Sequence, residues 1–226
     1  MQARGPGGVV QAERSGGVAG RMEESMTVCG LVRLDGVDVR RAVLTTMLAS
    51  SAAGLPAARG VHTDGAFGAV SAASAGADPT PPIAVDDAGL VVIADPGPRA
   101  VGARRSARAS ADAYRTGGRW ALLSPAGTIA VVWEPARARL VLARPSGAHT
   151  ELVTWSDGRL FAFGTEIEQV LSVGGGGPSR PARLRRLGSG EVVSITVAAA
   201  RHRPALTAVR QRTGAAAPGL APAGCP

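Results

Sequence analysis

The stretch from Gly127 to Leu171 constrains the fold most, because it predicts successive strands joined by short turns. Gly127–Glu134 (GTIAVVWE) is an apolar run rich in β-branched residues, and the turn Pro135–Arg137 separates it from a second apolar run, Leu140–Ala143. This spacing predicts a β-hairpin.

A second pair of strands follows within the same stretch. Ser156–Gly158 has the composition of a tight turn and lies between two apolar runs, Glu151–Trp155 and Leu160–Phe163. Elsewhere, short apolar runs predict four more strands: Thr27–Leu34, Ala66–Ala73, Leu90–Ala94 and Glu191–Val197. The chain is therefore rich in short strands.

Helical periodicity is confined to three segments. Val37–Ala53 has apolar residues at helical spacing, and Arg104–Tyr114 is followed by a pair of glycines that would end a helix. In Thr165–Leu171 we expect Thr165 as the N-cap and Glu168 at the N3 position of a capping box. The expected fold class is α+β.

The chain of 226 residues has room for one domain of ordinary size and for tails. Residues 1–26 predict a disordered leader, which translation from Met22 or Met26 would omit in part or whole. We expect the domain at 27–173. Residues 174–226, rich in Gly, Pro and Arg, predict a linker and tail with one strand.

The formal net charge is +8, and its distribution decides what it means. Residues 174–226 contain eight arginines and one acidic residue, Glu191, whereas the rest of the chain is almost neutral. No nucleic-acid-binding motif accompanies the excess, so we expect no nucleic-acid partner. No run is apolar and long enough to span a bilayer, so we expect no membrane partner and a cytoplasmic location.

The two cysteines, Cys29 and Cys225, lie near opposite ends of the chain. No metal-binding spacing surrounds either of them, so we expect no metal site, no cofactor and no disulfide framework.

Several motifs together resemble the class II glutamine amidotransferase domain of asparagine synthetases. They are VCGLVRLDG at the predicted first strand, ARGVHTDG at 58–65, AYRTGG at 113–118, and the long run TIAVVWEPARARLVLARPSGAHTELVTWSDGRLFAFGTEIEQVL. The resemblance implies an N-terminal nucleophile hydrolase fold, which is a four-layer αββα sandwich of two antiparallel sheets. The motif SGGxDS of the synthetase domain is absent from the sequence.

The resemblance implies Cys29 as the candidate nucleophile and Arg59 and Gly60 as candidate substrate-binding residues. In that family the nucleophile is the N-terminal residue, and its own amine acts as the base. Activity would therefore require processing to Cys29, or a start at Met26 that exposes Thr27 as a substitute. Without processing, Cys29 is a buried structural residue. For His62 we weigh a catalytic base against an exposed loop residue.

Other family positions depart from the pattern. Aligned on the strand Leu90–Ala94, Asp95 and Pro96 replace the Asn-Gly pair of the oxyanion hole, and neither can donate the required hydrogen bond. In the family, an arginine binds the carboxylate of glutamine and an aspartate binds its α-ammonium. At the corresponding places, Val70–Ser74 has no arginine and Arg105–Arg108 has no aspartate.

We therefore expect a degenerate amidotransferase domain without glutaminase activity. Its role would be that of a structural partner for an ATP-dependent amide-forming synthetase or cyclase on another chain, as in lasso-peptide cyclases. Self-association is the alternative to that partner. Two other functions stay open: an active glutamine-hydrolysing subunit after processing to Cys29, which alone would bind glutamine, and a non-functional fragment of a split synthetase gene.

Overall fold

A computed structural model of the chain describes residues 26–51, 58–73, 83–95, 103–123, 128–174 and 183–197. Within them, eleven strands form two antiparallel sheets. The first sheet has the order β10-β8-β9-β1-β3-β2 and consists of β1 (Met26–Arg33), β2 (Ala58–Asp64), β3 (Phe67–Ala73), β8 (Val153–Ser156), β9 (Leu160–Gly164) and β10 (Arg183–Arg186). The second has the order β11-β7-β6-β5-β4 and consists of β4 (Ile83–Val85), β5 (Val91–Asp95), β6 (Ile129–Glu134), β7 (Arg139–Arg144) and β11 (Glu191–Thr196).

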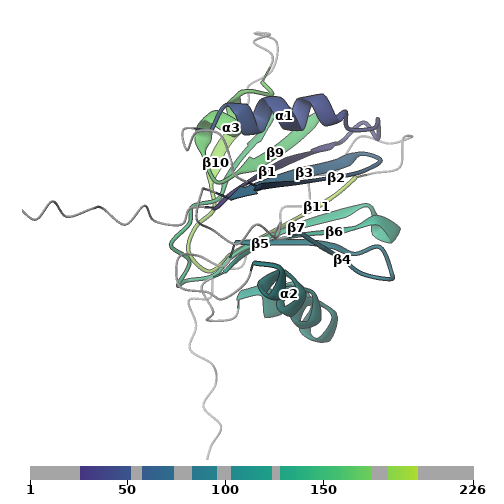
Figure 1. Ribbon diagram of the computed structural model, residues 1–226, viewed down its shortest axis with the longest axis vertical. Coiled ribbons are helices and arrows are strands. Elements are labelled where there is room, and N and C mark those ends of the chain that lie inside the picture. The colour runs from purple at the N-terminus through teal and green to yellow at the C-terminus, as the bar shows by residue number, and fades with distance from the viewer. Residues whose placement is uncertain are drawn as a thin grey trace, which may run out of the picture.

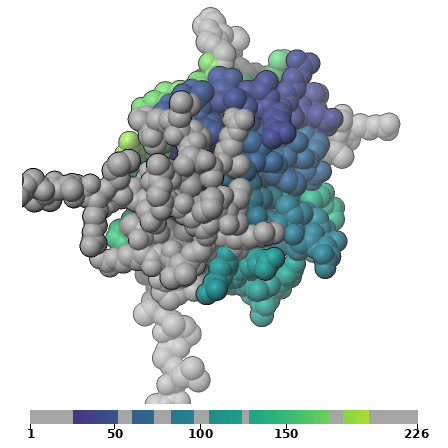
Figure 2. All heavy atoms as spheres, viewed as in Figure 1, coloured from purple at the N-terminus to yellow at the C-terminus, as the bar shows by residue number. Residues whose placement is uncertain are grey.

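Helices lie on the outer faces of the two sheets. Two of them, α1 (Arg41–Ala49) and α3 (Ile167–Leu171), pack on the first sheet. The third, α2 (Ala103–Gly117), packs on the second sheet and continues into the 3-10 helix η1 (Gly118–Leu123). Figure 1 shows α1 and α3 on one side of the stacked sheets and α2 on the other. In the space-filling view of Figure 2, the purple N-terminal elements and the teal region of α2 accordingly occupy opposite ends of the molecule.

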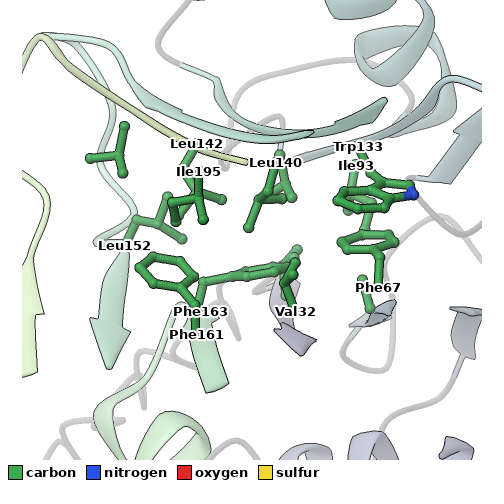
Figure 3. Close-up of a cluster of buried hydrophobic side chains, with 14 of the residues drawn as sticks. Val32, Phe67, Ile93, Trp133, Leu140, Leu142, Leu152, Phe161, Phe163 and Ile195 are labelled. Atoms are coloured by element: carbon green, nitrogen blue, oxygen red, sulfur yellow. The ribbon is translucent and has the colours of Figure 1, made fainter. Parts of the chain in front are cut away.

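The main core lies between the two sheets. Every second side chain along the strands points into this core. Examples are Val32, Phe67, Ile93, Leu140, Leu142, Phe163 and Ile195 (Figure 3). The rings of Phe67 and Trp133 stack with their centroids 5.1 Å apart, and Trp133 Nε1 donates a hydrogen bond of 2.7 Å to Asp64 Oδ2. Since Asp64 is on β2 and Trp133 on β6, this bond joins the two sheets.

Each sheet also buries its outer face. Leu31, Val70 and Ala162 lie beneath Leu44 and Met47 of α1, and a separate cluster of Val92, Val132 and Val141 lies beneath Ala111 and Tyr114 of α2. Strands that are covered on both faces need apolar residues at almost every position. This explains the nearly continuous apolar runs in β5, β6 and β7.

The structure confirms the two antiparallel sheets and most of the predicted strands. The hairpin of β6 and β7 is present, and its turn is the 3-10 helix η2 (Pro135–Arg137), followed by Ala138 at φ 43°. Gly127, Pro96 and the segments 1–25, 74–82 and 198–226 lie outside the described residues.

The helix boundaries require correction. The helix predicted at Val37–Ala53 begins only at Arg41, because Arg40 has an extended backbone and the Val39 N–H donates to Gly65 O instead of to a helix carbonyl. In α3 the N-cap is Glu166 and not Thr165, and the N3 residue of the capping box is Gln169 and not Glu168. The observed box, Glu166 with Gln169, stands one residue further along the chain, where α3 packs on β1.

Both sheets use residues beyond the predicted domain boundary at 173. The strand predicted at Glu191–Val197 is present as β11, which pairs with β7 along its whole length. The strand β10 was not predicted, because its sequence RLRR has only one apolar residue, and it pairs with β8 at the edge of the first sheet.

None of the described helices combines the length and the apolar character needed to cross a membrane.

Candidate functional site

The thiol of Cys29 lies inside the molecule. Cys29 is in the middle of β1, its exposed fraction is 0%, and it belongs to the apolar cluster beneath α1 and α3. Burial raises the pKa of the Cys29 thiol, and the charge of Glu166 raises it further. Because the thiolate is the nucleophilic form, a thiol held protonated in the core is unreactive.

The residue before Cys29 is fixed by the sheet and by α3. Val28 N–H donates to Thr165 Oγ1 over 3.2 Å, and Val28 O accepts from the Thr165 N–H over 2.9 Å. Val28 is also 1% exposed and is part of the core between the sheets. Cys29 therefore has an ordered peptide bond on its N-terminal side.

Gly30, the other half of the Cys-Gly motif, has a packing role. A Cβ atom at this position would lie 2.5 Å from Phe163 Cζ and 2.5 Å from the carbonyl oxygen of Gly68. Only glycine allows the Phe163 ring and the backbone of β3 to approach β1 this closely.

The candidate residues Arg59 and Gly60 lie on β2, at the edge of the first sheet, with β3 between them and β1. Arg59 is opposite Ala72, which is in turn opposite Thr27, whereas Gly60 is in register with Val28. Two strands in a sheet are separated by about 10 Å when one strand lies between them. The backbone positions of Arg59 and Gly60 are therefore remote from Cys29.

Asp95 is the last residue of β5 and is buried, with 4% exposed. Its carboxylate accepts a hydrogen bond of 2.6 Å from Thr150 Oγ1. At the position aligned with the oxyanion-hole donor, the structure thus has a hydrogen-bond acceptor.

A polar cluster that was not predicted surrounds Thr27. Thr27 is 8% exposed, and its Oγ1 lies 2.9 Å from Thr165 Oγ1 and donates over 3.2 Å to Glu166 Oε1. The fully buried Gln169 donates from Nε2 to Thr27 Oγ1, and Ser51 Oγ donates to Glu166 Oε1. With one proton and two lone pairs, the Thr27 hydroxyl has its hydrogen-bonding capacity filled. No local sequence pattern marked this cluster, because Glu166 is not one of the usual N-cap residues.

This cluster also has chemical capacity. A hydroxyl within hydrogen-bond reach of a carboxylate has the geometry of a nucleophile and its general base. The structure therefore assembles a polar environment around Thr27 and an apolar one around Cys29, two residues further along the same strand.

His62 is on β2 and half-buried, so the alternative of an exposed loop residue is wrong. Burial lowers the pKa of the His62 imidazole, and the nearby Asp64 only partly offsets this effect. Its Nε2 atom is buried without a hydrogen-bond partner, as is Ser71 Oγ on the neighbouring strand. Within the described ranges, no three His, Cys, Asp or Glu side chains are grouped so that they could hold a metal ion.

No family model and no curated protein matches the chain. Among solved structures it is similar to "glutamine phosphoribosylpyrophosphate (PRPP) amidotransferase from B. subtilis complexed with ADP and GMP", with a TM-score of 0.48 and 12% identity over 75% of this chain and 47% of that one. It is also similar to a "structure of the allosteric regulatory enzyme of purine biosynthesis", with a TM-score of 0.47 and 11% identity over 75% of this chain and 47% of that one. The chain thus spans about half the length of the structures it matches, at 47%.

Proposed function

We propose that this chain is an asparagine-synthetase-like glutamine amidotransferase domain of the four-layer N-terminal nucleophile hydrolase type, and that it does not hydrolyse glutamine. The observation that carries the proposal is the position of Cys29, which is fully buried within β1 and preceded by an ordered peptide.

Each requirement for attack on an amide is missing at Cys29. The thiol is held protonated in an apolar cluster, and its backbone nitrogen is part of a peptide bond. Asp95 adds a carboxylate where a donor would have to stabilise the tetrahedral intermediate. Loss of one oxyanion donor alone typically lowers kcat by about 10²–10³-fold.

The proposed role is that of a structural partner for a separately encoded, ATP-dependent amide-forming protein. Two large apolar side chains on neighbouring elements support an interface there: Leu171 at the end of α3 is 47% exposed, and Leu184 on the edge strand β10 is 44% exposed. The strand β10 also carries Arg183 and Arg186, both exposed, which favour an acidic rim on the partner. Self-association through the same face is the competing outcome.

The test of inactivity is ammonia release from glutamine. Full-length protein and a form that begins at Cys29 should both give no turnover above background. Turnover by the Cys29 form that disappears in Cys29→Ala would overturn the proposal and establish the processed hydrolase instead.

Partner binding is tested separately. We expect co-expression with an amide-forming synthetase encoded beside this chain to give a co-eluting complex, and Leu171→Arg with Leu184→Arg to abolish it. A matched change on an exposed residue elsewhere, Val37→Arg, should leave the complex intact. A monomer that ignores the synthetase would contradict this role.

One observation favours a second candidate function. Glu166 Oε1 lies 3.2 Å from Thr27 Oγ1, so a chain that begins at Thr27 would present an N-terminal hydroxyl next to a carboxylate. If this form is an amide hydrolase, protein beginning at Thr27 will release ammonia from glutamine and Thr27→Ala will abolish the release. Ammonia release at the background rate by both the form that begins at Thr27 and its Thr27→Ala variant would exclude this second function.

A further inference from the structure

A cavity of about 470 Å³ opens at the end of the second sheet, on the side covered by α2. It lies between the turn that joins β4 to β5, the turn that joins β6 to β7, and the C-terminal end of α2 (Figure 1). Its volume is within the range of small-molecule sites. Among the described residues, its lining includes neither Cys29 nor Thr27, so the cavity is separate from the polar cluster and the thiol described above.

Arg139 lines the cavity, and two hydrogen bonds hold its guanidinium in place. Arg139 donates from Nε to Glu134 Oε2 over 2.8 Å and from Nη2 to Tyr114 Oη over 3.0 Å. These two bonds fix the plane of the guanidinium, and no hydrogen bond within the described residues uses its Nη1. Burial, followed by the hydrogen bond with Glu134, raises the pKa of Tyr114 to about 12, so the phenol is neutral at physiological pH.

A second ion pair also lines the cavity. Arg115 binds the carboxylate of Asp86, and Asp86 Oδ1 accepts from the Leu90 N–H over 2.7 Å. Each lining carboxylate thus already has a close guanidinium partner. Arg137 is the third arginine that lines the cavity. Its side chain is 69% exposed, and its Nη1 contacts Glu134 Oε1 at a distance of 3.4 Å.

The residues that line the cavity thus carry three guanidinium groups and two carboxylates, and Asp112, outside the lining, also pairs with Arg115. The cavity also has apolar walls. Ala88, Leu90, Pro135 and Ala136 line it between the charged groups. A guanidinium edge matches the two oxygens of a carboxylate, whereas a doubly charged phosphate would exceed the single surplus charge of the lining residues.

We propose that this cavity binds a small organic carboxylate, with the carboxylate group between Arg137 and Arg139 and the apolar part against Leu90 and Pro135. The site is independent of glutamine hydrolysis, and it gives the domain a ligand that is unrelated to the Cys29 position.

The test uses full-length protein with benzoate as the probe and benzyl alcohol as its neutral counterpart, followed by saturation-transfer NMR and calorimetry. We expect saturable benzoate binding with a Kd on the order of 1 mM and no saturable binding of benzyl alcohol. Arg137→Gln, a change at an exposed residue, should weaken benzoate binding at least tenfold, on the order of the loss expected for one charged contact. Arg159→Gln, on an exposed turn of the other sheet, should leave the affinity unchanged.

A second variant tests location. Ala88→Trp, at an exposed position on the cavity rim, should occlude the site and abolish binding while the circular dichroism spectrum stays that of the unmodified protein. Binding of benzoate that survives both Arg137→Gln and Ala88→Trp would overturn the proposal, as would equal binding of benzyl alcohol or tighter binding of inorganic phosphate.

Discussion

Thr27 and Cys29 lie two positions apart on β1, and their side chains share the face of the sheet that α1 and α3 cover. Thr27 meets the polar start of α3, where Thr165, Glu166 and Gln169 contact it. Cys29 packs in the apolar cluster that includes Leu44 and Met47. A shift of two residues along one strand thus separates a hydroxyl within a polar cluster from a thiol within an apolar one.

The burial of Cys29 predicts that its thiol is inert in the folded protein. In a Cys225→Ser background, a thiol-reactive reagent such as DTNB should react with Cys29 only as fast as the protein unfolds, because the pKa of the thiol is raised and reagent cannot reach it. Titration in urea provides the fully reactive control. Rapid labelling without denaturant would show that Cys29 is accessible and would remove the main support for the inactive domain.

His62 predicts a dependence of stability on pH. The unfolded chain binds a proton at this residue near its ordinary pKa of 6.5, whereas burial lowers the pKa in the folded state. Between these two values the unfolded state holds more protons, so the free energy of unfolding must decrease as the pH falls from about 6.5 toward the folded pKa. Urea unfolding at several pH values should show this slope. It should vanish in His62→Gln and persist in His149→Gln, a change at an exposed histidine.

At the scale of elements, α3 shows how tertiary contacts override a local signal. Thr165 with Glu168 satisfies the sequence pattern of a capping box, whereas the structure forms the box from Glu166 and Gln169, one residue further along the chain. In the structure Thr165 instead binds Val28 and Thr27, which fixes the chain against β1 and leaves Glu166 as the N-cap. The helix therefore begins where its docking on the sheet requires.

The two registers are distinguished by a pair of neighbouring substitutions. Gln169→Ala removes half of the capping box and leaves the buried Thr27 hydroxyl with one partner fewer, so it should lower the free energy of unfolding by roughly 2–4 kcal/mol. Glu168→Ala, at an exposed position, should lower it by at most about 0.5 kcal/mol. Urea unfolding curves measure both. Equal effects would mean that α3 does not use the capping box seen here.

At the scale of the whole molecule, the C-terminal part completes both sheets. β10 adds an edge to the first sheet, and β11 adds an edge to the second. Val193 and Ile195 of β11 enter the core between the sheets, and Val192 packs on the side of α2. Residues that come after the predicted domain therefore close the core.

This arrangement predicts a sharp difference between two truncations. Protein that ends at residue 190 lacks β11 and exposes the core side of β7, and the loss of about 1.5–3 kcal/mol for each of three buried side chains is comparable with the stability of a whole domain. We expect it to be insoluble or unfolded by circular dichroism. Protein that ends at residue 197 keeps every described strand and the bond from Val197 N–H to Ala138 O, so it should remain folded. A folded product of the shorter form would contradict the role assigned to β11.

The sequence by itself determined most of the strands and the hairpin of β6 and β7, because apolar runs bounded by turn residues are local signals. It did not indicate β2 or β4. It also indicated that Cys29 lies in an apolar strand. Only the tertiary structure decided the start of α3, the strand β10, the polar surroundings of Thr27, and the cavity between Arg115, Arg137 and Arg139. These features depend on contacts between residues far apart in the chain, such as Thr27 with Gln169 and Tyr114 with Arg139. Such contacts arise only when the two sheets and their helices have packed together.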